Sequence, residues 1–197
     1  MDLNIDPKAM RLIEMACVLS ISLLIASVMG CIADESDSSL KSNPDIPKTM
    51  LPDGFKLLAA LPEMDSSVNM TEYITKFYGE KKIEPLEISV GIYQWEAKGG
   101  IPYDAKITYI RLPDEEQALA AIDNFRSQGD YTKQIARGLD IFGNATVNGH
   151  DALEIRHIQN SKSYKYIYLW NNVNLVVLAE GNNDRNQSLQ LAAATGL

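Results

Sequence analysis

Ser163–Glu180, with the sequence SYKYIYLWNNVNLVVLAE, decides the fold of this chain. Two runs rich in aromatic and β-branched residues flank Asn171-Asn172, and this pattern predicts a hairpin of two strands, 163–170 and 173–180. In the second strand Leu175 to Leu178 are all apolar. A strand without a polar face is covered on both sides, so we expect it at the centre of a sheet.

Further strands are predicted on the N-terminal side of this hairpin. Asn148-Gly149 is the strongest hairpin signal in the chain and is expected to join strands 143–147 and 150–158. Apolar and polar residues alternate from Leu86 to Tyr93, which is typical of a half-buried strand. That strand covers 85–95. Two others are predicted before the hairpins, at 55–61 and 104–112.

Helices are predicted where capping residues precede amphipathic runs. Asp114 and Asp184 each have a glutamine three residues later, so we expect helices to begin at both positions. The apolar spacing of 69–78 predicts a third, short helix, and 131–142 is left unassigned. The order of elements indicates an α+β fold: a mainly antiparallel sheet with two or three helices packed on it, in one domain over 49–197.

An uncharged apolar run, Met15–Cys31 (MACVLSISLLIASVMGC), follows the basic residues Lys8 and Arg11. The pattern predicts a hydrophobic signal peptide or membrane-anchor helix within 1–31, with the start at Met1 or Met10 left open. Its end, VMGC, resembles the lipobox of prokaryotic lipoproteins. The resemblance implies that Cys31 is lipidated and becomes the first residue of the mature chain. An uncleaved transmembrane anchor and a buried helix of a soluble protein are the alternatives.

Residues 32–48 are acidic and contain Pro44 and Pro47, so we predict a disordered, flexible linker. The basic residues before the apolar run hold the N-terminal flank inside the cell, so we expect 49–197 on the extracytoplasmic side of the cell membrane, lipid-anchored or single-pass. The net charge of −8 and the pI near 4.8 argue against nucleic acid as a partner. No cysteine follows Cys31, so the exported domain has no disulfide.

Three segments, SVGIYQW (89–95), NGHDALEI (148–155) and LWNNVNLVVLAEGN (169–182), resemble uncharacterised archaeal surface lipoproteins. The order of elements over 55–197 also resembles small α/β sandwich domains of the PsbP and Mog1 kind. These resemblances imply an exported domain and assign no catalytic residue.

Aromatic side chains alternate along two predicted strands and should share one face of the sheet. Amphipathic rings of this kind recognise sugars or peptides, so the stripe is a candidate ligand platform. The alternative is that the rings pack under a helix or fill cross-strand pairs. The six residues are Tyr93, Trp95, Tyr164, Tyr166, Tyr168 and Trp170.

Three acceptor sequons begin at Asn69, Asn144 and Asn186, and they are candidate glycosylation sites if the domain is exported. The two histidines, His150 and His157, lack other ligands at metal-binding spacing, so no metal site is predicted.

No phosphate loop, nucleophile elbow or metalloprotease motif is present in the sequence. We therefore predict a membrane-anchored, extracytoplasmic binding or accessory domain without a cofactor, which is not an enzyme. Its ligand would be a glycan, a small molecule or another envelope protein. A structural component of the cell envelope without a ligand pocket is the first alternative. A hydrolase or transferase with unrecognised residues, for example a pocket that joins Asp104 and Glu154, is the second.

Overall fold

The computed structural model describes residues 42–95, 103–160 and 163–197. Ser42–Leu197 forms one compact unit, and the description below concerns it. The predicted signal or anchor over 1–31, with Cys31, lies outside the described residues, as does most of the predicted linker. Within the described ranges, no helix has the length and apolar character needed to cross a membrane.

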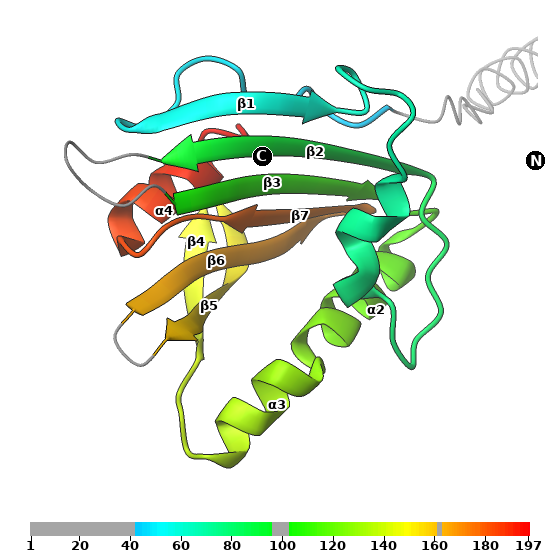
Figure 1. The fold of residues 1–197 in the computed structure, drawn as a ribbon. Coiled ribbons are helices and arrows are strands. Elements are labelled where there is room, and N and C mark those ends of the chain that lie inside the picture. The colour runs from blue at the N-terminus through cyan, green and yellow to red at the C-terminus, as the bar shows by residue number, and fades with distance from the viewer. Residues whose placement is uncertain (1–41, 96–102, 161–162) are drawn as a thin grey trace, which may run out of the picture. The chain divides into compact units, whose positions relative to one another are not determined.

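Seven antiparallel strands form a single sheet in the order β1-β2-β3-β7-β6-β5-β4 (Figure 1). The strand predicted to be central, β7, lies in the middle of this order. The α+β prediction is thus confirmed. The strands are β1 (Phe55–Leu61), β2 (Glu87–Trp95), β3 (Tyr103–Arg111), β4 (Phe142–Val147), β5 (His150–Asn160), β6 (Ser163–Asn172) and β7 (Leu175–Glu180).

The turn between β6 and β7 is displaced by two residues from its predicted position. Asn172 pairs with Leu175, so the turn residues are Val173 and Asn174, and Val173 adopts a positive φ of 54°. The reason is a tertiary contact: Asn174 Nδ2 donates to the carbonyl oxygen of Leu112 at 2.7 Å, and the Leu112 N–H donates to the Asn174 carbonyl oxygen. Contacts with the end of β3 therefore fix the turn at Asn174.

Helices cover both faces of the sheet. The described residues contain a 3₁₀ helix, η1 (Met70–Phe77), and three α-helices, α2 (Glu115–Arg126), α3 (Gly129–Ala136) and α4 (Arg185–Ala193). We call the side packed by η1, α2 and α3 the α2 face, and the side packed by α4 the α4 face. Figure 1 shows α2 and α3 running down one side of the sheet and α4 on the other.

The two predicted capping residues are confirmed: Asp114 accepts from the Gln117 N–H, and Asp184 accepts from the Gln187 N–H. Helix α3 was not predicted. Its N-cap, Gln128, makes no side-chain capping bond, and Tyr131 is its buried residue. A short helix with one buried ring and no cap leaves little trace in a sequence.

Residues 42–48 form a strap that packs on the α4 face, although they were predicted to belong to the linker. Ile46 is 5% exposed and packs in the α4-face cluster. The Asn43 N–H donates to Glu87 Oε2 at 2.6 Å, and the Tyr93 hydroxyl donates to the Pro47 carbonyl oxygen at 2.8 Å. The linker prediction therefore does not hold for these residues, because one apolar side chain and a few hydrogen bonds hold them on the sheet.

Candidate functional site

The aromatic stripe shares one face of the sheet, but much of it is core. Tyr93, Tyr168 and Trp170 are all buried in the α4-face cluster, and Trp170 is 1% exposed. Tyr164 is 47% exposed, at the outer end of β6. The strap covers Tyr93, and the Tyr168 hydroxyl donates to the Arg185 carbonyl oxygen at the start of α4, at 3.2 Å.

The prediction of a ligand platform made of all six rings is therefore wrong, because three of the rings are buried in the folded domain and cannot contact a ligand. The outer rings are those of Trp95, Tyr164 and Tyr166, of which Trp95 and Tyr166 are half-buried. β3 and β7 lie between β2, which carries Trp95, and β6. The alternation along the strands placed the rings on one face correctly, but only the packing of the strap and α4 decides which of them are exposed.

Glu154 and Asp104 do not form a shared pocket. The Glu154 carboxylate is buried on the α4 face, where Arg185 Nε donates to its Oε2 at 2.7 Å. Asp104 is exposed at the start of β3, and its side chain belongs to the α2 face, because the next residue, Ala105, packs on the α4 face. Glu154 thus ties α4 to the sheet, and the paired carboxylates that would suit a hydrolase are not brought together.

The described residues bring part-buried ionisable groups together in one place on the α2 face, which we call the polar cleft. A cavity of about 200 Å³ opens between η1 and the strands β3 and β7. Lys76 and Glu72 of η1 line one side, and Lys106 and Glu180 line the other. Glu180 pairs with Lys106 across the two strands, and its Oε2 lies 2.7 Å from Lys106 Nζ.

Charge compensation within the polar cleft centres on Glu180. Its side chain is 13% exposed and that of Lys106 is 29% exposed, so this ion pair is largely removed from solvent. Burial by itself raises the pKa of Glu180, but the ammonium groups of Lys106 and Lys165 outweigh it, and the net pKa is lowered. Glu180 is therefore a carboxylate at neutral pH.

Lys165 is the second ammonium group beside Glu180. β7 ends at Glu180, and the Lys165 side chain on β6 crosses the space beyond that end to reach β3, where Nζ donates to the Asp104 carbonyl oxygen at 2.8 Å. Burial lowers the pKa of Lys165, and the carboxylate of Glu180 opposes this effect. In the part of the chain that the structure describes, no carboxylate lies within ion-pair distance of Lys165 Nζ.

Two ring side chains beside the polar cleft have polar atoms without a partner. The rings of Tyr131 on α3 and His157 on β5 meet edge to face, 5.9 Å apart. Among the described residues, neither the buried Tyr131 hydroxyl nor His157 Nδ1 has a hydrogen-bond partner. Burial raises the pKa of Tyr131, with a contribution from the Glu180 charge, so its hydroxyl stays a donor.

Sequence reasoning missed the polar cleft. Lys106, Lys165 and Glu180 lie far apart in the chain, and each stands in an otherwise apolar or aromatic run. A charged residue within an otherwise apolar strand could have pointed to the site, because the alternation of side chains along a strand places it on a definite face of the sheet. The strand order β3-β7-β6 is what makes the three residues neighbours, and the sequence pattern does not contain this order.

His150 and His157 are the two histidines of the chain, and no metal site was predicted at either. Across residues 42–95, 103–160 and 163–197, no group of three His, Cys, Asp or Glu side chains could hold a metal ion.

The asparagines of the three predicted sequons, Asn69, Asn144 and Asn186, are all exposed. The sequon hydroxyl of Ser188, however, is buried and lies 2.7 Å from the Asp184 carbonyl oxygen, to which it donates. The first two sequons are thus more accessible in the folded domain.

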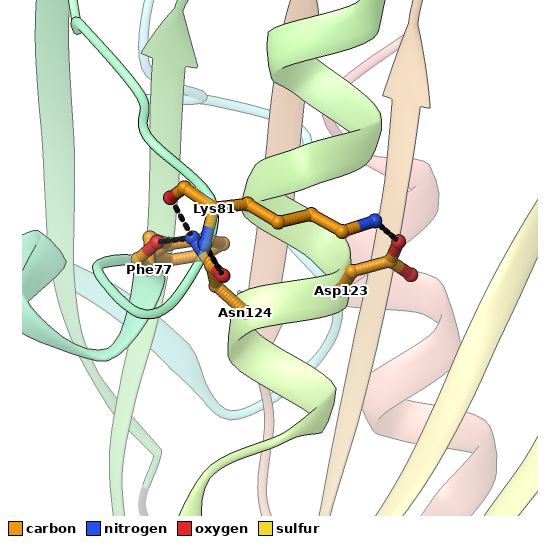
Figure 2. A network of polar contacts seen from close by, with 4 residues as sticks. All are labelled: Phe77, Lys81, Asp123 and Asn124. Atoms are coloured by element: carbon orange, nitrogen blue, oxygen red, sulfur yellow. Dashed lines mark hydrogen bonds and ion pairs between the residues drawn. The ribbon is translucent and has the colours of Figure 1, made fainter.

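A second hollow lies between α2 and the segment 81–84, with a volume of about 790 Å³. Figure 2 shows how this segment is held: Asn124 Nδ2 donates to the carbonyl oxygens of Phe77 and Lys81, and Asn124 Oδ1 accepts from the Lys81 N–H. Lys81 Nζ is also paired with Asp123. The charged groups here are exposed and solvated, so the hollow has less capacity for specific binding than the polar cleft.

Comparison with known proteins adds no assignment to this geometry. No protein-family model, no curated protein and no solved structure matches the chain.

Proposed function

We propose that this protein is a membrane-anchored, extracytoplasmic binding or accessory domain, which is held at the cell membrane through Cys31 and binds its ligand in the polar cleft. The observation that carries the anchoring is Met15–Cys31, an uncharged run that follows basic residues and ends in VMGC. The folded unit beginning at Ser42 contains no cysteine, which suits a domain that functions outside the cytoplasm without needing a disulfide.

The length of the tether follows from the strap. The folded unit begins at Ser42, so only residues 32–41 separate it from Cys31. Ten residues span at most about 35 Å when fully extended.

The binding part of the proposal is supported by the polar cleft rather than by the aromatic rings. Glu180, Lys106 and Lys165 are part-buried ionisable groups next to a cavity. The pKa values of Glu180 and Lys165 are both lowered, and shifted pKa values in a cleft are typical of functional sites. The buried rings of Tyr168 and Trp170 serve the core of the α4 face.

Lipidation is tested by expressing the full chain and its Cys31→Ser variant in the native host. We expect the wild-type chain in the membrane fraction, with an intact mass that corresponds to loss of residues 1–30 and addition of lipid. Cys31→Ser should keep its leader and carry no lipid. A membrane-bound chain of full mass, 21.8 kDa, would instead indicate the uncleaved anchor. Recovery of the unmodified wild-type chain from the cytosol would refute the proposal.

A further inference from the structure

We propose that the polar cleft binds a small free oxyanion, a carboxylate or a phosphate, between Lys76 on η1 and Lys106 on β3. This inference rests on the proposed function in treating the domain as a binding domain, and it names the ligand class. It does not depend on the anchor.

The first argument is an excess of hydrogen-bond donors. Within the described ranges, Lys76 Nζ has neither an ion pair nor a hydrogen bond, although it lines the cavity. Lys165 uses Nζ for a backbone carbonyl oxygen, and the Tyr131 hydroxyl has no partner in the part of the chain described. The Glu180 carboxylate of the cleft forms an ion pair with Lys106, although its Oε2 has no hydrogen-bond partner of good geometry among the described residues. A group with several acceptor oxygens is the complement of such a site.

The second argument concerns charge. Lys106, Lys165 and Glu180 are the part-buried charged groups, and together they carry one net positive charge. Lys76 also lines the cavity, but it is exposed and screened by solvent, as is Glu72 in the same lining, so these two add no net charge to the sum. The acidic groups that also face this region are Glu72, Asp104 and Asp130, all of them exposed and therefore screened by solvent. His157, from β5, is the remaining titratable neighbour, and burial lowers its pKa, so it is neutral at pH 7.

The size of the cavity limits the ligand class. At about 30 Å³ for each water molecule, about 200 Å³ holds about six waters. Phosphate or a short carboxylic acid fits this space, whereas a nucleotide or an oligosaccharide does not. Phe77 and Phe125 form an apolar part of the cavity wall. The cavity therefore accommodates a short hydrocarbon portion attached to the carboxylate of the ligand.

The test uses the full chain in mild detergent, with thermal unfolding followed by near-ultraviolet circular dichroism. Sodium phosphate and sodium acetate are titrated against sodium chloride at equal ionic strength. We expect a saturable rise of the melting temperature with at least one of the two oxyanions and none with chloride. A charged hydrogen bond contributes about 1.5–3 kcal/mol, so Lys76→Gln should weaken the apparent affinity about tenfold or more.

Matched controls separate specific binding from general effects. Lys56→Gln removes the same charge from an exposed position on β1 and should leave the affinity unchanged. Tyr131→Phe and Tyr109→Phe each remove a buried hydroxyl without a partner in the described chain, but Tyr109 packs on the α4 face. We expect only Tyr131→Phe to weaken oxyanion binding. Both variants should still fold, because neither loses a hydrogen bond.

Two results would overturn the inference. One is that neither oxyanion raises the melting temperature more than chloride does. The other is that Lys76→Gln and Lys56→Gln weaken binding equally, which would show a general charge effect. Neither result bears on the lipidation experiment, so failure of the oxyanion site and failure of the anchor are distinguishable.

Discussion

Asn124 and Gly79 should be energetically coupled, because each fits only in the presence of the other. Asn124 is 4% exposed and holds the segment after η1 through the three hydrogen bonds drawn in Figure 2. The chain passes so close to α2 that a Cβ atom at Gly79 would lie 2.7 Å from Asn124 Oδ1 and 2.9 Å from its Cγ. The close approach, rather than an unusual φ, requires glycine at this position.

The magnitudes follow from these contacts. Asn124→Ala removes three hydrogen bonds, each contributing about 0.5–1.5 kcal/mol, so we expect a loss of about 2–4 kcal/mol in the free energy of unfolding. Gly79→Ala forces the segment or the amide to move, at a cost of about 1–3 kcal/mol. When Asn124 is already alanine, Oδ1 and Cγ are gone and only its Cβ remains, at 3.1 Å. In that background Gly79→Ala should therefore cost about 1–2 kcal/mol less than in the wild type.

The assay is urea unfolding of the full chain in mild detergent, for the wild type, the two single variants and the double variant. The coupling energy is the difference between the loss in the double variant and the sum of the two single losses. Independent sites add to within about 0.5 kcal/mol. If the three losses are additive within that range, the crowding between Gly79 and Asn124 is not real, and our account of this segment is wrong.

The remaining predictions concern α4, the strap and the polar cleft. In Gly181→Ala, the added Cβ would lie 2.1 Å from Ser188 Oγ and 2.8 Å from its Cα, so α4 must shift. We expect the free energy of unfolding in urea to fall by about 3 kcal/mol. A fall below about 1 kcal/mol would contradict this close packing of β7 and α4. Tyr93→Phe removes the hydrogen bond to the strap, so the free energy of unfolding should fall by about 1 kcal/mol and amide hydrogen exchange in 42–48 should become faster. Unchanged exchange would show that other contacts hold the strap. Burial lowers the pKa of His157, so between its folded pKa and about 6.5 the unfolded chain binds more protons, and stability should fall as the pH drops below about 6.5. His157→Gln should flatten this dependence between about pH 7.5 and 5.5, and equal slopes in the wild type and His157→Gln would refute the prediction.

Much of the secondary structure is determined locally and could be predicted. The caps at Asp114 and Asp184 depend on residues three positions apart, so both helix starts are correct. The turn at Asn148-Gly149 is likewise where it was predicted, with both residues at positive φ. The turn between β6 and β7 was placed wrongly, because the contact between Asn174 and Leu112 joins distant parts of the chain.

The candidate site shows the same division between local and distant information. The sequence by itself determined that Leu175 to Leu178 are covered on both faces and that the aromatic residues of β6 share one face, since both follow from a period of two. Only the tertiary structure decided that α4 and the strap bury Tyr93, Tyr168 and Trp170. It alone also set Lys106 and Lys165 beside Glu180. The physical reason is that a strand's sequence specifies which side chains share a face, whereas strand order and the packing of covering elements depend on contacts between residues far apart in the chain.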